Sequence, residues 1–501
     1  MSRLITIVVA SVLCLPTFAQ DALVAEPLSA DTLVDAAPTL DAMASEAEQE
    51  EAERLDPEFA QADESDTDTI TLPPNGWAAL LPKCARPDSN FISLPGGFSP
   101  EMGILIDKLD SVLLYGKGRV SILHIGGSHV QADMYTHEFR CRIDSLNNGL
   151  RPPRGYLFPF RIAKTNNPSN FRVTAAGKWD KARCSVRKPR PALGIDGISV
   201  WTSDPMAWIG LDMDPQHSGR WTATSLHLIG RSVPSTSGSV LTPIIRIDGE
   251  DIRPAAYDSA TMTFTFRLPR AVSDFKLHFA HSSLAKADSI CASAAASLHV
   301  PALARPTFYV DGVIPDNDED GIVYHTVGVN GAAVPHYLRC EYFERQVAAL
   351  HPDLVIMAIG INDASGPNFV PENFKANYDN LIRVFRRINP NCAFIFITNN
   401  DSKRRVSRRK RIVNKNGVLA QEAFRDIATK WQGGLWDLFD VMGGLGSMAE
   451  WQKCGLAGRD NIHFSRLGYK VVGALFYDAF LNFYLDQDPV DQSSTDDASE
   501  E

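Results

Sequence analysis

Three short apolar runs constrain the fold of this chain more than any other feature. They cover residues 120–125, 354–359 and 393–398, and a turn-forming residue follows each. Runs of this length, bounded by turn residues, are typical of strands covered on both faces. Helical patterns accompany them at residues 136–146, 337–350 and 374–388. Strands that alternate with helices predict an α/β fold around a parallel sheet.

Residues 171–309 follow a different pattern. Met262, Phe264, Phe266 and Leu268 alternate with polar residues, which places them on one face of a strand. Gly or Pro interrupts the segment roughly every 10 residues, which is typical of all-β domains. We therefore predict a β-sandwich inserted into the α/β domain, whose strands resume at residues 321–327.

The two ends of the chain differ from its body in charge. A charged residue, a short apolar run and Ala19 predict a signal peptide over residues 1–19, and hence an exported protein that is periplasmic or extracellular. Residues 20–73 are acidic and poor in aromatics, which predicts a disordered linker. The acidic residues 486–501 predict a similar disordered tail. The overall formal charge of −11 therefore hides a basic folded body.

Four polar clusters lie after predicted strands or close to the C-terminus. In parallel sheets, ligands bind beyond the carboxyl ends of the strands. Ser128 follows two glycines at a strand-to-helix turn; taken alone, such a serine is more often a helix cap. Gly331 and Asn362 are able to donate hydrogen bonds to an oxyanion. Asp460 precedes His463 by three residues, so its carboxylate is able to hold an imidazole that accepts the proton of a serine.

Taken together and in this order, the four clusters resemble the motifs of the SGNH/GDSL hydrolases. The resemblance implies a flavodoxin-like three-layer domain formed by residues 74–170 and 310–485, and a carboxylic ester hydrolase without metal or cofactor. It implies that Ser128 is the nucleophile and that His463, oriented by Asp460, is the base. It also implies an oxyanion hole made by the N–H groups of Ser128 and Gly331 and the side chain of Asn362.

Two features depart from a compact member of that family. Gly127 stands where the family has an Asp before the serine, which leaves the rate of turnover open. A long β-rich segment, residues 171–309, separates Ser128 from Gly331. This order of segments resembles the peptidoglycan O-acetylesterases, whose jelly-roll-like insert is similar to a carbohydrate-binding module.

Two further clusters follow the third apolar run. Asn399, Asn400 and Asp401 are candidate substrate contacts, although a plain loop is an equal alternative. The basic run at residues 403–411 either guides an anionic glycan or forms the solvated face of a helix that pairs with the acidic linker.

The leading hypothesis is a secreted serine esterase that removes acyl groups, in the first place acetyl, from a carbohydrate polymer. The alternatives are a lipase or thioesterase on the same scaffold, and a glycan-binding protein without activity. Widely spaced cysteines without a CxxC pair argue against a zinc site. Export argues against nucleic acid as a partner, and no segment after the leader has the length of a membrane span.

Overall fold

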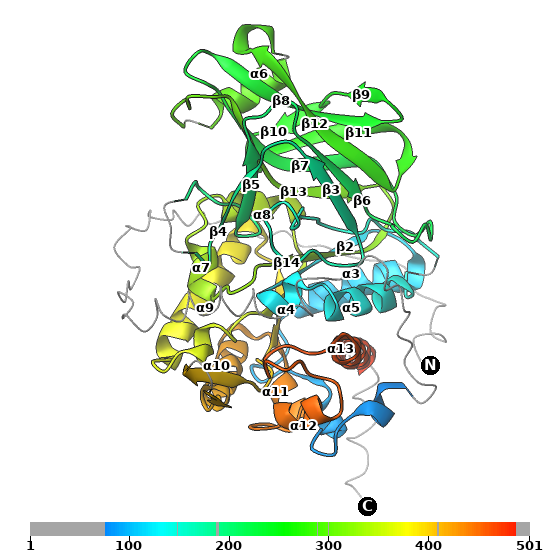
Figure 1. The fold of residues 1–501 in the computed structure, drawn as a ribbon. Coiled ribbons are helices and arrows are strands. Elements are labelled where there is room, and N and C mark those ends of the chain that lie inside the picture. The colour runs from blue at the N-terminus through cyan, green and yellow to red at the C-terminus, as the bar shows by residue number, and fades with distance from the viewer. Residues whose placement is uncertain are drawn as a thin grey trace, which may run out of the picture.

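The structure is a computed structural model that describes residues 76–486 except 148, 187–189, 288, 299 and 408–409. The predicted leader, the whole of the acidic linker and the tail beyond Asp486 lie outside the described residues. Figure 1 shows an α/β domain with a β-rich domain above it. Of the helices that the structure describes, none is long and apolar enough to cross a membrane.

A six-stranded sheet lies at the centre of the α/β domain, and five of its strands are parallel. In spatial order the strands are β1 (Ile92–Ser93), β19 (Gly434–Trp436), β16 (Ala393–Ile397), β15 (Leu354–Ala358), β2 (Arg119–Gly126) and β14 (Gly321–Gly328). Only β1, at the edge, runs antiparallel to its neighbour. The three apolar runs predicted from the sequence form β2, β15 and β16, which lie side by side in the interior of the sheet.

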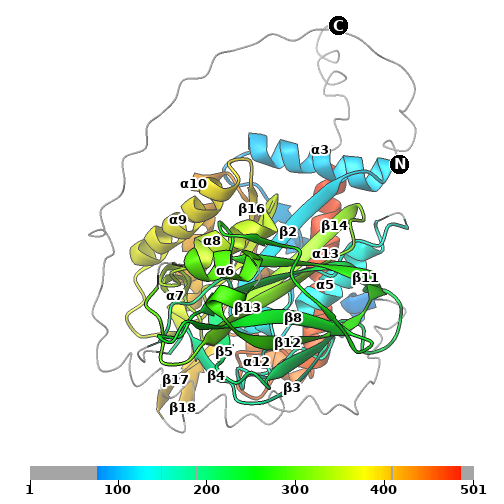
Figure 2. The same ribbon diagram turned by 90° about the horizontal axis from the view of Figure 1, so that it is seen from above.

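Helices cover both faces of this sheet, as the runs of apolar residues in its strands require (Figures 1 and 2). Along β2, Ile122 faces one helical layer and Leu123 faces the other, because successive side chains alternate. One layer contains α3 (Pro100–Tyr115), α5 (Tyr135–Asp144) and α13 (Arg466–Asp486); the other contains α7 (Val334–Leu338), α8 (Phe343–Val347), α9 (Pro371–Ile388) and α10 (Asn416–Trp431). The short helices α4 (Ser128–Gln131), α11 (Leu438–Val441) and α12 (Met448–Lys453) complete the domain.

The single helix predicted over residues 337–350 is wrong. The segment is divided into α7, α8 and a short 3-10 turn, Ala348–Leu350. The break occurs where the backbone N–H of Tyr342 donates to the carbonyl of Leu193, and where the Glu341 carboxylate accepts from the Leu193 N–H. Contacts with a distant segment therefore replace the helical hydrogen bonds that the local pattern favours.

The inserted segment forms two antiparallel sheets. One consists of β10 (Ala256–Asp258), β11 (Thr263–Val272), β7 (Ala223–Val233), β13 (Thr307–Asp316), β5 (Ile198–Thr202) and β4 (Asp180–Arg183); the other of β3 (Arg172–Ala176), β6 (Trp208–Asp212), β12 (Asp274–Ser283), β8 (Ser239–Ile247) and β9 (Glu250–Ile252). The helix α6 (Ser289–Ala296) packs beside β7 and β10. Phe279 and Phe308 pack across the two sheets with ring centroids 5.1 Å apart.

The alternation predicted in the insert is present at Phe264 and Phe266 of β11, which are fully buried, whereas Arg267 is exposed. Met262 is buried too, but it lies before β11 with a φ of 61°, and Leu268 is only partly buried. The predicted end of the insert at residue 309 falls inside β13, which stays in the antiparallel sheet as far as Asp316. The insert therefore ends after Asp316, and residues 317–320 connect it to β14 of the central sheet.

A buried carboxylate fastens the insert to the α/β domain. Asp311 of β13 is fully buried, and its carboxylate accepts hydrogen bonds from Ser199 and from the Arg231 guanidinium. The same carboxylate accepts a hydrogen bond from Gln346 of α8, with 2.7 Å between Nε2 and Oδ2. Because Gln346 belongs to the α/β domain, this one anion connects the cores of both domains.

We expect Asp311→Ala to lower the free energy of unfolding by about 3–5 kcal/mol, because the substitution leaves a buried guanidinium without its anion. Urea unfolding measures this loss. The matched control is Asp251→Ala, which breaks the exposed Arg246–Asp251 pair on the same insert and should barely change stability. Equal losses in the two variants would contradict the role given to Asp311.

Candidate active site

Ser128 lies where the central strand of the sheet turns into a helix. It follows β2 directly, after Gly126 and Gly127, and is the first residue of α4. The Tyr337 hydroxyl donates to the carbonyl of Gly126 over 2.8 Å and holds the end of the strand. The serine hydroxyl is thereby presented at the carboxyl edge of the parallel sheet, where the sequence analysis expected it.

The structure brings Ser128, His463 and Asp460 into one chain of hydrogen bonds. Ser128 Oγ lies 2.8 Å from His463 Nε2, and His463 Nδ1 lies 2.6 Å from Asp460 Oδ2. The other carboxylate oxygen of Asp460 accepts from the backbone N–H groups of Ile462 and His463. The imidazole is therefore fixed with one nitrogen toward the serine, the arrangement in which a histidine removes a serine proton.

Asp460 stays ionised because of these contacts. Its burial would raise the pKa of its carboxyl, but the charge and hydrogen bonds of His463 and the two backbone N–H groups lower that pKa well below its usual range. The carboxylate is thus a fixed negative charge next to the imidazole, so it stabilises the imidazolium that forms when His463 accepts a proton.

The three groups expected to form an oxyanion hole lie together. Gly331 has a φ of 75° in the turn after β14. Asn362 donates from Nδ2 to the carbonyl of Ala332 over 2.9 Å. The same Nδ2 lies 3.5 Å from the position that a Cβ on Gly127 would occupy, beside Ser128. The amide of Asn362 is thus a hydrogen-bond donor beside Ser128.

The carboxylate of Asp363 clamps two of these loops together. Both of its oxygens lie 3.2 Å from the backbone nitrogen of Val334, three residues after Gly331. Because the carboxyl faces inward, burial raises its pKa to about 7, although hydrogen bonds from the backbone oppose this shift. The Asp363 carboxylate therefore fixes the loops of Gly331 and Asn362 relative to each other.

The candidate substrate contacts Asn399, Asn400 and Asp401 are placed differently from one another. Asn400 is buried, and its amide donates to the carbonyl of Ile462 over 2.8 Å. Asp401 is buried as well and accepts from the N–H of Met448. Asn399 is partly exposed, and its oxygen lies near Gly360. The contacts of Asn400 thus support the loop of His463, and substrate contact by these three residues stays a prediction.

The basic run does not form a helix, so that alternative is wrong. It folds into a hairpin of β17 (Lys403–Ser407) and β18 (Lys410–Val413). Arg411 donates to the carbonyl of Asp460 over 2.7 Å, and the backbone N–H of Lys403 donates to the carbonyl of Asn461. Sequence reasoning missed that this hairpin braces the loop of His463, because nothing local links residues 403–411 to residue 460.

A second histidine also went unrecognised as part of the site. The ring of His129 packs against that of His463, with centroids 5.0 Å apart, and His129 Nδ1 lies 2.8 Å from the Tyr469 hydroxyl. Burial, and then the charge of His463, lower the pKa of His129 to about 3. His129 is therefore neutral and serves as a wall for the imidazole of His463.

Comparison with protein families agrees with this geometry. Residues 288–471 match the GDSL-like Lipase/Acylhydrolase family. The match contains Gly331, Asn362, Asp460 and His463, whereas Ser128 lies before it, on the other side of most of the insert. Residues 288–471 are therefore similar to a GDSL-like acylhydrolase domain. The predicted family and the predicted class, a carboxylic ester hydrolase, are both confirmed.

A solved structure shares the fold of this chain. A peptidoglycan O-acetylesterase superposes with a TM-score of 0.60 at 18% identity, over 79% of this chain and 99% of that one. An acetyl xylan esterase and a catalytic mutant of an acetylxylan esterase from Geobacillus stearothermophilus each match 32% of this chain at 19% identity, with TM-scores of 0.26 and 0.25 and with 81% and 72% of their own chains covered. Among curated proteins, no sequence matches at a significant level.

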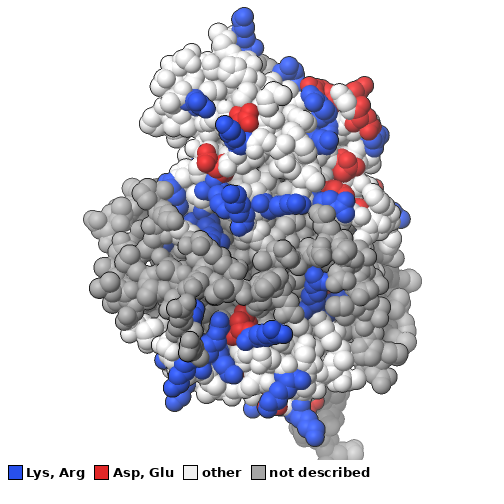
Figure 3. All heavy atoms as spheres, in the orientation of Figure 1, with Lys and Arg blue, Asp and Glu red and all other residues white. Residues whose placement is uncertain are grey.

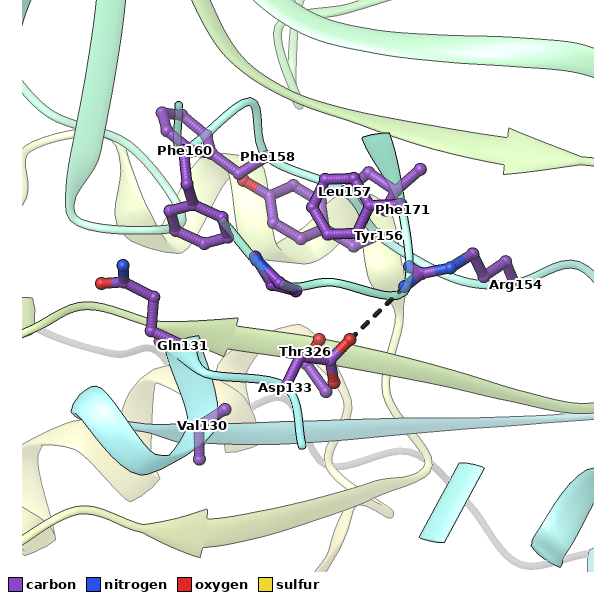
Figure 4. A pocket seen from close by; sticks show the side chains of 12 residues that line it. Val130, Gln131, Asp133, Arg154, Tyr156, Leu157, Phe158, Phe160, Phe171 and Thr326 are labelled. Carbon is purple, nitrogen blue, oxygen red and sulfur yellow. Dashed lines mark hydrogen bonds and ion pairs between the residues drawn. The ribbon is translucent and has the colours of Figure 1, made fainter. Parts of the chain in front are cut away.

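A small pocket lies beside α4 in the acylhydrolase, where the α/β domain meets the segment that leads into the insert (Figure 4). It is lined by Val130, Gln131, Asp133, Arg154, Tyr156, Leu157, Phe158, Phe160, Pro168, Phe171, Thr326 and Gly328. Ser128, His463 and Asp460 do not line it. Its buried Arg154 pairs with Asp133, which also pairs with Arg140. We read this pocket as part of the junction between the domains.

No group of three or more His, Cys, Asp or Glu side chains that could hold a metal ion occurs in the described part of the acylhydrolase.

Substitution by Ala should destabilise the protein to different extents at the two glycines before Ser128. A Cβ on Gly126 would lie 2.4 Å from Val130 Cγ2 and 2.8 Å from the carbonyl of Ala358, whereas a Cβ on Gly127 meets nothing closer than 3.5 Å. We expect Gly126→Ala to cost about 1–3 kcal/mol of stability through overpacking, and Gly127→Ala to cost clearly less. Thermal unfolding of both variants measures the difference. A Gly127→Ala variant as unstable as Gly126→Ala would contradict the described loop.

The stability of this acylhydrolase should depend on the titration of Asp363. The pKa of the Asp363 carboxyl is about 7 in the folded protein, above its ordinary value of 3.8. The stability that the protonated carboxyl contributes is therefore present at low pH and is lost as the pH rises through about 7. Between about pH 5 and about pH 8, the free energy of unfolding of the wild type should fall by on the order of 2 kcal/mol relative to that of the Asp363→Asn variant. Urea unfolding at both pH values measures this, and parallel pH profiles would contradict it.

Proposed function

We propose that this protein is an exported serine esterase that removes O-acyl groups, in the first place O-acetyl groups, from a carbohydrate polymer. One observation carries the proposal: the hydrogen-bond chain from Ser128 through His463 to Asp460 at the carboxyl edge of the sheet. Export is inferred from residues 1–19, which lie outside the described residues.

In the proposed mechanism, Ser128 Oγ attacks the ester carbonyl while His463 Nε2 accepts its proton. Asp460 stabilises the imidazolium. The N–H groups of Ser128 and Gly331 and the amide of Asn362 donate to the oxyanion. When the intermediate collapses, His463 returns the proton to the sugar oxygen that leaves, and an acyl-enzyme remains. A water molecule then attacks the acyl group with His463 as base, which releases the carboxylic acid and restores Ser128.

The carbohydrate polymer is inferred from the architecture. The peptidoglycan O-acetylesterase that superposes on this chain is covered over 99% of its length, so the likeness includes the inserted sheets as well as the α/β domain. The insert also contacts the carboxyl end of β14, which leads to Gly331: the backbone N–H of Gly328 donates to Asp196 Oδ1 over 3.0 Å. A domain held at this place is able to frame a large substrate. Peptidoglycan is therefore the first polymer to test.

We expect Ser128→Ala and His463→Ala each to abolish nearly all acetate release from O-acetylated peptidoglycan and from a chromogenic acetate ester. Because the two residues act as a unit, the double variant should be hardly slower than either single variant. Acetate release is measured enzymatically, with longer acyl esters in parallel to test for a lipase or thioesterase.

Ser145→Ala and His351→Ala are the matched controls, since both residues are exposed. They should keep wild-type activity. Normal turnover by Ser128→Ala would overturn the assignment of the nucleophile. A wild-type protein that binds glycan but releases no acid from any ester would indicate a glycan-binding protein without activity.

A further inference from the structure

The hairpin beside the site carries an unusual arrangement of charge. Arg405 of β17 lies directly opposite Arg411 of β18 in the register of the two strands. Like charges at directly opposed positions destabilise a two-stranded sheet. The exposed Lys410 and the partly exposed Lys403 and Arg404 add further positive charge to the same two strands. Within the described part of the chain, Lys403, Arg404 and Lys410 form no ion pair with a carboxylate.

This hairpin is fixed to the proposed catalytic residues. Arg411 donates to the carbonyl of Asp460, and the N–H of Lys403 donates to the carbonyl of Asn461, two residues before His463. The hairpin therefore packs against the loop that carries Asp460 and His463.

A second basic group borders the site on the side of Gly331. The side chains of Thr165 and Asn166 accept hydrogen bonds from the amide of Asn330, the residue before Gly331. They also accept hydrogen bonds from the amide of Gln131 in α4. The exposed Lys164 immediately precedes Thr165 in the chain.

Two more cations lie near Lys164. Lys181 and Arg183 are two residues apart on β4, so their side chains lie on the same face of that strand. Partial burial, and then the positive charges of Lys164 and Arg183, lower the pKa of Lys181. We call Lys164, Lys181 and Arg183 the insert wall, and Lys403, Arg404, Arg405, Lys410 and Arg411 the hairpin wall.

The acidic side chains nearest to the hairpin wall do not neutralise it. Asp460 is engaged by His463, and Asp401 is buried with a pKa raised by that burial. Figure 3 shows Lys and Arg side chains gathered along the lower edge of the β-sandwich and again over the lower part of the α/β domain. Residues on both sides of the proposed site thus present cations.

We propose that the two basic walls bind a carboxylate-bearing glycan, so that the substrate of this esterase is a polyanion whose acidic units flank the acylated sugar. The inference rests on the proposed function and specifies its substrate class. Arginine is suited to carboxylates because its planar guanidinium donates two parallel hydrogen bonds. Anionic units on either side of the ester gain binding energy far from the reacting atoms, and that energy orients the ester toward Ser128.

The test compares three acetylated polymers: O-acetylated polygalacturonate, with carboxylates on the sugars; O-acetylated peptidoglycan, with carboxylates on the peptides; and acetylated xylan as the neutral polymer. Raising the salt shortens the screening length from about 30 Å at 0.01 M to about 8 Å at 0.15 M. We expect kcat/KM to fall roughly tenfold for at least one carboxylate-bearing polymer, and to change little for acetylated xylan. Whichever polyanion responds identifies the source of the carboxylates.

Two double variants separate the walls: Arg404→Gln with Arg405→Gln, and Lys164→Gln with Lys181→Gln. Each should lower kcat/KM on the responsive polyanion by about three- to tenfold, and by less on acetylated xylan. The matched control, Lys83→Gln with Lys117→Gln, removes two exposed positive charges elsewhere and should change neither rate. Equal losses in the control, or equal salt dependence on the neutral polymer, would overturn the proposal.

Binding of polygalacturonate and of de-acetylated peptidoglycan to the full-length Ser128→Ala protein keeps the two proposals distinguishable. Binding without acetate release by wild type would contradict the proposed function and leave the basic walls supported. Acetate release with no binding of either polyanion at low salt would overturn this inference alone. A rate that rises with salt would also overturn it, and would indicate that the acidic ends of the chain occupy the walls.

Discussion

The common edge of a parallel sheet is the constraint on which the site depends. The strands β2, β14 and β15 end at one edge, so the residues that follow them meet there although they are distant in the chain. Ser128 follows β2, Gly331 follows β14 and Asn362 follows β15. Any segment inserted between two such strands is compatible with the site, provided that the chain returns to the sheet in register. The β-sandwich meets this condition.

Support for the site comes from contacts across domains and loops rather than from the motifs themselves. Asp311 fastens the insert to α8 through Gln346, and Asp363 holds the turn of Gly331 against the loop of Asn362. The loop of His463 is braced by Asn400 and by the hairpin residue Arg411. Each of these partners satisfies a polar group that would otherwise be costly to bury. The catalytic geometry thus depends on a shell of residues that performs no chemistry itself.

The same shell sets the electrostatics of the site. Asp460 is kept ionised beside His463, and His129 is kept neutral on the other side of that imidazole. Beyond them, two groups of Lys and Arg residues border the site from the insert and from the hairpin. In the proposed mechanism, the negative charge of Asp460 orients the base, and the positive charges of the two walls bind the polymer. This separation matches the proposed division between chemistry near Ser128 and recognition farther out.

The sequence by itself determined the layered α/β fold, the inserted β-sandwich and the motif residues, because periodic burial and strand-end residues are local properties. It misjudged the segment after Tyr337, where contacts with Leu193 replace a helix, and it left open whether the basic run is helical. Only the tertiary structure decided that this run is a hairpin touching Asp460, that His129 faces His463, and that Lys164 lies near Lys181. These are contacts between residues far apart in the chain, and no local pattern encodes such distances.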